Sequence, residues 1–237
     1  MSGIAGALEV VKDLEALSAR AAELIADRIR SGGSPFRLAL SGGNTPRGCY
    51  RHLAHLHQIP WDHVEIFLGD ERFVPPDHPD SNYHMIRQTL LAGEAVTPRA
   101  VFAVPTDTTP EDAAGAYEEI LRQEYGASRL RPDLPLFDLQ LLGLGEDGHT
   151  ASLLPGQPVL EEQTRWVAVV PEGRKEPRIT LTYPVLESSR LTVFLVSGAD
   201  KKDALARVRA GDPSLPAGRL KPQGDVIWLA DRAALGT

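Results

Sequence analysis

The sequence predicts an α/β fold with a mostly parallel sheet that is covered by helices on both faces. Short apolar segments of the length of buried strands alternate with amphipathic helical segments along the chain. Three of the expected strands are followed at once by a turn rich in glycine or in charged side chains. Open parallel sheets hold their ligands at such carboxyl ends, so the same pattern predicts where the site lies.

The expected helices follow from apolar spacing and from helix-start signals. Apolar residues at helical spacing from Val10 to Ile29 predict a first helix, which ends at Gly32-Gly33. Thr45 followed by Pro46 predicts the start of a second helix, with a hydroxyl cap and a proline in the first turn. The remaining helices are expected over residues 81–91, from Thr109-Pro110 onward, and over residues 201–208. The expected strands are residues 36–40, 64–68, 101–104, 137–142, 166–170, 179–183, 191–196 and 226–229.

Composition limits the class of protein. The chain has 237 residues, of which 42% are hydrophobic and 24% charged, and no break in composition divides it, so we expect one domain over residues 1–237. A net charge of −7 opposes non-specific binding of nucleic acid. The sequence has neither an 18-residue apolar run nor a signal-peptide pattern, so we expect a cytoplasmic protein without a membrane partner.

The cysteine and histidine residues give no metal-site pattern. Cys49 is the one cysteine, which excludes an internal disulfide, and its place in an amphipathic helix is typical of a small buried residue. His52, His55 and His57 are close in sequence, but their spacing does not bring all three to one helical face. We therefore expect no metal.

The run from Gly143 to Ser152, Gly-Leu-Gly-Glu-Asp-Gly-His-Thr-Ala-Ser, is the most informative segment. It directly follows the expected strand over residues 137–142, and its glycines permit a tight turn. Within it, Asp147 stands near His149, and histidine is the side chain whose ordinary pKa, about 6.5, suits proton transfer near neutrality. The alternative interpretation is a strand-to-helix turn with a surface histidine.

A second glycine-rich turn follows the strand over residues 36–40. Its residues are Ser41, Gly42, Gly43, Asn44 and Thr45. Consecutive backbone amides, hydroxyl groups and a helix amino end form a cradle for an anion. The turn lacks the lysine of the nucleotide P-loop and differs from the dinucleotide fingerprint, so a monophosphate fits better than a nucleotide. The alternative is a tight turn before a capped helix.

Further charged residues stand near predicted sheet ends. Asp70 and Arg72 follow the strand over residues 64–68, where Arg72 is suited to a phosphate or an oxyanion and Asp70 to sugar hydroxyls or to orienting another residue. Arg178 and Lys201 are additional cations near strand ends. Solvated salt bridges and ordinary surface charges are the alternatives.

Taken together, these motifs resemble those of 6-phosphogluconolactonases, in the glucosamine-6-phosphate isomerase/6-phosphogluconolactonase family. The motifs are Ser-Gly-Gly-Asn-Thr-Pro, Gly-Asp-Glu-Arg-Phe-Val-Pro with Ser81-Asn82-Tyr83, Leu-Leu-Gly-Leu-Gly-Glu-Asp-Gly-His-Thr-Ala-Ser-Leu-Leu-Pro-Gly and Arg-Ile-Thr-Leu-Thr. Their order and spacing extend over nearly the whole chain. The residues after Asp-Gly-His continue as in lactonases, whereas related deaminases have an Asn-Glu-Pro element there.

The resemblance implies a Rossmann-like fold of the deaminase, ribose-phosphate isomerase and CoA-transferase type. It implies hydrolysis of 6-phospho-D-glucono-1,5-lactone to 6-phosphogluconate in the oxidative pentose phosphate pathway, without a metal or other cofactor. His149 corresponds to the general base, and Asp147 accompanies it. Arg72 and Arg178 correspond to phosphate or oxyanion contacts, and Lys201 matches a basic position of the superfamily.

Lactone hydrolysis agrees with these residue types, because it requires a base for water and a cation or hydrogen-bond donor for the oxyanion. The expected ligand is a small phosphosugar lactone, and a monomer is preferred. The alternatives are a deaminase that releases ammonia from glucosamine 6-phosphate and a non-catalytic sugar-phosphate sensor.

Overall fold

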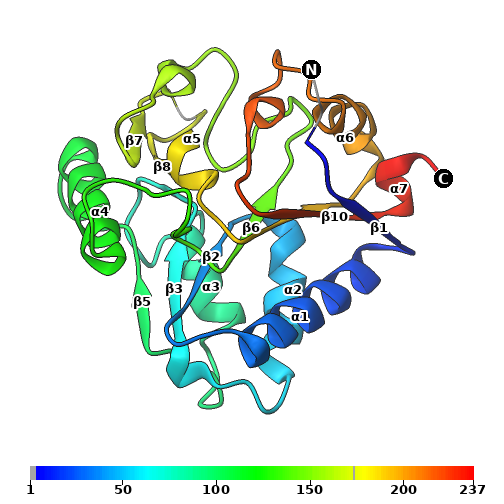
Figure 1. The fold of residues 1–237 in the computed structure, drawn as a ribbon, viewed down its shortest axis with the longest axis horizontal. Coiled ribbons are helices and arrows are strands. Elements are labelled where there is room, and N and C mark those ends of the chain that lie inside the picture. The colour runs from blue at the N-terminus through cyan, green and yellow to red at the C-terminus, as the bar shows by residue number, and fades with distance from the viewer. Residues whose placement is uncertain (1–3, 173) are drawn as a thin grey trace.

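The computed structural model describes residues 4–172 and 174–237 and confirms the α/β fold (Figure 1). Its main sheet has seven strands, and every strand pair in it is parallel. In spatial order the strands are β1 (Ala7–Val11), β10 (Asp225–Asp231), β9 (Leu191–Val196), β6 (Leu139–Gly143), β2 (Phe36–Leu40), β3 (Val64–Leu68) and β5 (Ala100–Phe102). The carboxyl ends of β9, β6 and β2 therefore lie side by side at one edge.

Helices cover both faces of this sheet, as the sequence predicts. The helices are α1 (Leu14–Ser31), α2 (Asn44–His55), α3 (Asn82–Thr89), α4 (Pro110–Tyr125), α5 (Tyr183–Leu186), α6 (Lys202–Arg209) and α7 (Arg232–Leu235). In Figure 1, α1, α2 and α3 lie below the sheet, whereas α5 and α6 lie above it. Short 3-10 turns occur at Trp61–His63, Pro158–Glu161, Ala199–Lys201 and Pro216–Arg219.

Two strands that the sequence predicts belong to a second sheet, not to the main one. This sheet is antiparallel and consists of β4 (Asp70–Arg72), β8 (Arg178–Leu181) and β7 (Val167–Val170). Alternation of apolar and polar residues predicts a strand but does not identify its partner. The pairing of β4 with β8 places Arg72 opposite Arg178.

The start of the chain differs from the prediction, because Val10 and Val11 belong to strand β1 and not to the first helix. Their spacing from the apolar residues of α1 happens to fit the helical face, but they pair with the end of β10. The helix begins after Asp13, whose carboxylate accepts a hydrogen bond from the backbone N–H of Ala16 at 3.0 Å.

Helix α2 begins at Asn44, one residue before the predicted hydroxyl cap. Gly43 precedes it with a φ of 104°, a conformation that favours glycine, and this turn sets the helix start in place of a side-chain cap. The prediction at α4 is confirmed, because the Thr109 hydroxyl accepts from the N–H of Asp112 at 3.2 Å. The last predicted helix begins at Lys202, because residues 199–201 form a 3-10 turn. Tyr183, predicted at a strand end, opens α5.

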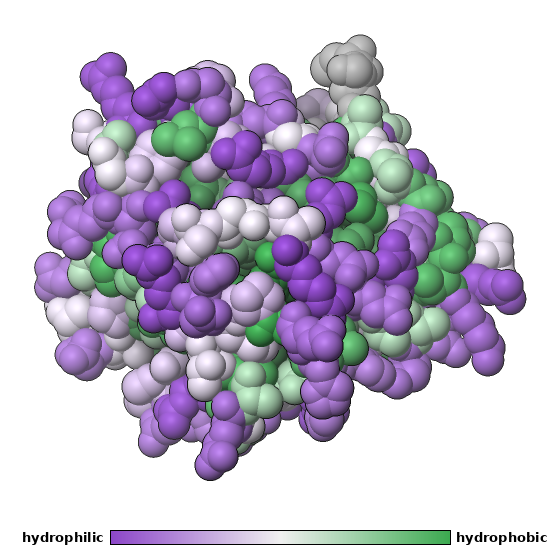
Figure 2. Space-filling view, turned by 60° about the horizontal axis from the view of Figure 1, so that its bottom comes forward, coloured by the Kyte–Doolittle hydropathy of each residue, from purple (hydrophilic) through white to green (hydrophobic). Residues whose placement is uncertain are grey.

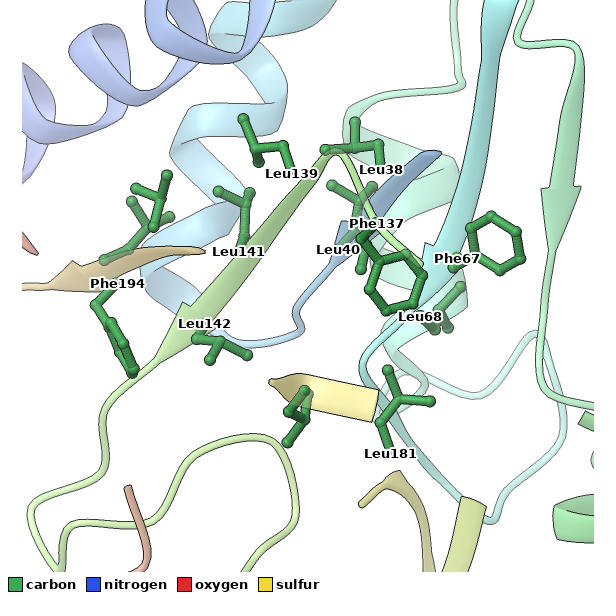
Figure 3. Packing of buried hydrophobic residues seen from close by; sticks show 14 of the residues in the cluster. Leu38, Leu40, Phe67, Leu68, Phe137, Leu139, Leu141, Leu142, Leu181 and Phe194 are labelled. Atoms are coloured by element: carbon green, nitrogen blue, oxygen red, sulfur yellow. The ribbon is translucent and has the colours of Figure 1, made fainter. Parts of the chain in front are cut away.

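The core lies between the main sheet and the layers on its two faces. Figure 3 shows Leu139 and Leu141 of β6 pointing toward the helices of one face, whereas Leu142 points toward Leu181 of β8 on the other. Cys49 of α2 is fully buried, as predicted. The core thus fixes β6 from both sides, up to the residue where the chain turns into the Asp147–His149 loop.

Polar and charged side chains dominate the face shown in Figure 2, where apolar side chains gather only in small groups between them. Among residues 4–172 and 174–237, no helix is long and apolar enough to cross a membrane.

Candidate active site

A cleft with a volume of about 460 Å³ opens at the carboxyl ends of β2, β6 and β9. All the predicted site residues line it except Asp147: Ser41, Gly42, Gly43, Asn44, Thr45, Asp70, Arg72, His149, Arg178 and Lys201. A larger cavity of about 880 Å³ lies beside Ile4 and Val226, at the opposite end of the sheet. Its described lining includes no predicted site residue, so the smaller cleft is the candidate site.

His149 and Asp147 form a hydrogen-bonded pair at the edge of the cleft. The imidazole Nδ1 lies 2.5 Å from Oδ1 of Asp147, and Oδ2 of the same carboxylate accepts from Nη2 of Arg174 at 2.9 Å. Burial acts to raise the pKa of Asp147, but the His149 hydrogen bond and the Arg174 charge outweigh it, so this pKa lies below the ordinary value. In the neutral imidazole, an ionised carboxylate at this distance favours the tautomer with the proton on Nδ1 and the lone pair on Nε2.

The backbone of this loop is closed tightly around the imidazole. The N–H of Gly145 donates to the carbonyl of His149 at 2.9 Å, and the N–H of Gly148 donates to the carbonyl of Gly145 at 3.0 Å. A Cβ at position 145 would lie only 2.1 Å from Nδ1 of His149 and 2.6 Å from Oδ1 of Asp147. Glycine at this position is therefore what admits the pair.

The Ser41–Thr45 turn is fixed from beneath by Tyr50. The tyrosine hydroxyl donates to the carbonyl of Ser41 at 2.7 Å and accepts from its N–H at 3.1 Å. On the other side, Gly42 packs so closely against Asn82 that a Cβ there would lie 1.8 Å from its amide oxygen. The turn leads into α2, so the amino end of a 12-residue helix faces the cleft.

Asp70 and Arg178 lie together in the cleft wall, with little access to solvent. Arg178 Nη1 lies 3.9 Å from Asp70 Oδ2, and the Ser152 hydroxyl donates to that oxygen at 2.5 Å. Burial lowers the pKa of Arg178, and the Asp70 charge partly opposes this effect. The β4–β8 pairing brings these residues together from distant parts of the chain.

All three residues of β4 form hydrogen bonds with residues 80–83, where the chain enters α3. Asp70 accepts from the side-chain amide of Asn82, and Arg72 donates to the carbonyl of Asp80 at 2.6 Å. Between them, the Glu71 carboxylate accepts from four donors, namely the N–H groups of Arg72, Asn82 and Tyr83 and the hydroxyl of Ser81. This segment forms the cleft wall next to the glycine-rich turn.

Lys201 reaches the cleft from the turn after β9. Its Nζ lies 2.8 Å from the Asp200 carboxylate. Ser197, four residues before Lys201, also lines the cleft. The Ser197 hydroxyl donates to Oδ2 of Asp231 at 2.5 Å, and the N–H of Gly198 donates to Oδ1 of Asp231 at 3.2 Å. Asp231 thus fixes the turn that carries Lys201.

Four further polar residues line the cleft without having been assigned a role from the sequence: Asn82, Thr150, Arg174 and Ser197. Asn82 was quoted in a motif without a role, and Ser197 directly follows an expected strand, which is a usable signal. Arg174 lies in an irregular loop with a φ of 80°, and nothing in the local pattern marks it. In the described part of the chain, no group of three or more His, Cys, Asp or Glu side chains is arranged to hold a metal.

Known proteins are similar to this chain in sequence and in fold. The profile of the glucosamine-6-phosphate isomerases/6-phosphogluconolactonase family matches residues 12–228. The chain belongs to this family. A 6-phosphogluconolactonase of Nostoc sp. is 39% identical over 236 residues, which is 96% of each chain, and one of Synechocystis sp. is 43% identical over 203 residues, 83% of this chain and 82% of the relative. The solved structure of 6-phosphogluconolactonase from Trypanosoma cruzi superimposes with a TM-score of 0.83 at 30% identity, over 100% of this chain and 98% of the other.

In this member of the glucosamine-6-phosphate isomerase/6-phosphogluconolactonase family, an imidazole held by an ionised carboxylate shares one cleft with a glycine-rich turn and several cations. Such an arrangement can take a proton from water beside a bound anionic ligand. The cations and backbone donors can stabilise negative charge that develops on that ligand.

Proposed function

We propose that this protein hydrolyses 6-phospho-D-glucono-1,5-lactone to 6-phosphogluconate, in the oxidative pentose phosphate pathway. One observation carries the proposal: His149, held by Asp147, lines the same cleft as the Ser41–Thr45 turn. The names of the lactonase relatives support it. The proposal assigns the base to His149 and the anion cradle to the turn.

The reaction begins with water beside the lactone carbonyl. Nε2 of His149 takes one proton from the water, and the water oxygen bonds to the carbonyl carbon. The carbonyl oxygen becomes an oxyanion. The oxyanion collapses, the bond from the carbonyl carbon to the ring oxygen breaks, and the imidazolium returns the proton to that ring oxygen. The product is the open-chain acid, and the imidazole is neutral again. Asp147 stabilises the imidazolium and orients the ring throughout.

The phosphate group supplies the binding energy that orients the carbonyl. In the proposal it lies against the Ser41–Thr45 turn at the amino end of α2, with Lys201, Arg178 and Arg72 as the nearby cations. Binding energy from a remote, non-reacting group holds the reacting atoms in place. Asp70 contributes by orienting the cation next to it.

A parallel assay tests the proposal. Freshly generated 6-phosphogluconolactone is followed against its spontaneous hydrolysis, and glucosamine 6-phosphate is tested for release of ammonia with the same preparation. We expect accelerated loss of the lactone and no ammonia. Ammonia release without lactonase activity would instead identify a deaminase, and binding of 6-phosphogluconate with neither activity would identify a sensor.

The proposal includes a monomeric, single-domain enzyme in the cytoplasm. The alignment with the Nostoc lactonase covers 96% of each chain, which supports a single domain. Sedimentation equilibrium at micromolar concentration tests the oligomeric state, with a mass near 25.7 kDa as the expected result.

A further inference from the structure

Ser152 is a buried residue of the His149 loop that the proposed mechanism does not use. It has no exposed surface, and it lies where three parts of the cleft meet. Its N–H donates to Oγ1 of Thr180 in β8 at 3.2 Å, and its hydroxyl lies between Asp70 of β4 and Arg178 of β8. Ser152 therefore links the loop that carries His149 to the Asp70 carboxylate and to the Arg178 guanidinium.

The hydrogen bonds at Ser152 have a direction. A serine hydroxyl has one proton, and here it donates to Asp70 Oδ2 at 2.5 Å. Its oxygen then accepts from Arg178 Nη1 at 3.5 Å. The guanidinium and the carboxylate themselves stand 3.9 Å apart, beyond direct hydrogen-bond reach. The Ser152 hydroxyl thus bridges the two charged side chains by hydrogen bonds.

We propose that Ser152 is a positioning residue that keeps the Arg178 guanidinium apart from Asp70, and thereby sets how tightly the cleft binds the phosphate group of the ligand. This inference rests on the proposed function only for the identity of that ligand. It assigns no proton transfer to Ser152.

The energetic reason is the low exposure of the two charges. The side chains of Arg178 and Asp70 are 13% and 8% exposed, so water screens them little. Without the hydroxyl, Oδ2 of Asp70 loses its shortest hydrogen bond, and the nearest cation replaces it. The guanidinium then moves from its present 3.9 Å separation into direct hydrogen-bond contact with Asp70, and withdraws from the cleft that it lines.

The experiment measures the binding of inorganic phosphate by calorimetry and the kinetic constants for the lactone. In Ser152→Ala we expect the Kd for phosphate and the KM for the lactone to rise about tenfold, the size of one lost charge-assisted hydrogen bond, with kcat changed less than about threefold. In an Asp70→Asn background, the carboxylate charge that attracts Arg178 is absent, so the same serine substitution should raise Kd less than about threefold.

The matched control is Ser189→Ala. Ser189 is also fully buried, with its hydroxyl donating to the carbonyl of Leu191 at 2.9 Å, but it lies before β9 and away from the cleft. It should lose stability without a change in Kd. Should Ser152→Ala fail to fold, Ser152→Cys keeps the size of the side chain but donates weakly, and an intermediate rise in Kd is expected.

An unchanged Kd in Ser152→Ala, an equal rise with and without Asp70→Asn, or a fall in kcat at constant KM overturns the inference. A failure of the proposed function would give a different result from a failure of this inference. In that case the wild-type protein does not hydrolyse the lactone, yet the phosphate measurements still decide the role of Ser152.

Discussion

Nδ1 of His149 lies 2.5 Å from Oδ1 of Asp147, two residues earlier in the same loop. The contact is made within a single turn, so it does not depend on docking of distant segments. It fixes both the orientation of the imidazole and its tautomer, because the ionised carboxylate accepts a hydrogen bond from Nδ1–H. The base proposed for the reaction is thus oriented before any ligand binds.

The Asp147 carboxylate predicts a pH dependence of stability. Its pKa in the folded protein lies below the ordinary value, so between the two values the unfolded chain binds more protons than the folded one. The contribution of Asp147 is therefore complete above about pH 4 and is lost as the pH falls through the folded value. Urea unfolding of the wild type and of Asp147→Asn should show a stability difference that shrinks below about pH 4. A difference that stays constant down to pH 2.5 would contradict this assignment.

Gly145→Ala should lower activity while the fold remains. The new Cβ would meet the His149 imidazole at 2.1 Å and displace it from Asp147. We expect kcat for the lactone to fall by about a hundredfold, because misplacement of a catalytic group by about 1 Å has that effect. Gly115→Ala is the control, since a Cβ there meets nothing within 4 Å, and it should keep wild-type activity. Wild-type kcat in Gly145→Ala would show that the loop relaxes without cost.

Glu71→Gln should destabilise the protein through the cleft wall. Glu71 is 2% exposed, and its carboxylate accepts from four donors. Burial raises the pKa of Glu71, although the three backbone N–H donors oppose the rise. In the variant, the NH₂ group of the glutamine would replace one of these acceptor oxygens and would stand opposite N–H donors. We therefore expect the free energy of unfolding to fall by about 2 to 4 kcal/mol. Glu94→Gln, at an exposed position, should change it by less than about 0.5 kcal/mol. Equal stability of the two variants would refute this role for Glu71.

Arg178→Ala should act mainly on binding. We expect KM for the lactone to rise by about ten- to a hundredfold, the range of one charge-assisted hydrogen bond, with a smaller change in kcat. Arg129→Ala removes an exposed cation that does not line the cleft, and it should leave both constants unchanged. If kcat alone falls in Arg178→Ala, the cation acts on the oxyanion and not on the phosphate.

Much of the fold could be predicted from the sequence, because periodicity and chain order carry it. The strands over residues 36–40, 64–68 and 191–196 agree with the structure. Periodicity placed Val10 in a helix because its spacing fits a helical face, and only pairing with β10 shows the strand. The separate sheet of β4, β7 and β8 depends on contacts between distant segments, which local patterns do not contain.

The candidate site was predictable where its residues stand in turns after strands. The Ser41–Thr45 turn and the His149 loop meet in one cleft for that reason. Glu71 and Ser152 could not be given roles, because their partners lie in other segments of the chain. Arg174 comes from an irregular loop, where no periodicity or capping signal indicates a direction.

The rate of lactone hydrolysis by His149→Asn is the most direct measurement. The wild-type protein should accelerate the loss of fresh 6-phosphogluconolactone above its spontaneous rate. In His149→Asn, kcat should fall by about a hundred- to ten-thousandfold, the usual contribution of a general base, while KM stays within about threefold. A variant with wild-type kcat, after correction for spontaneous hydrolysis, would contradict the assignment of His149 as the base.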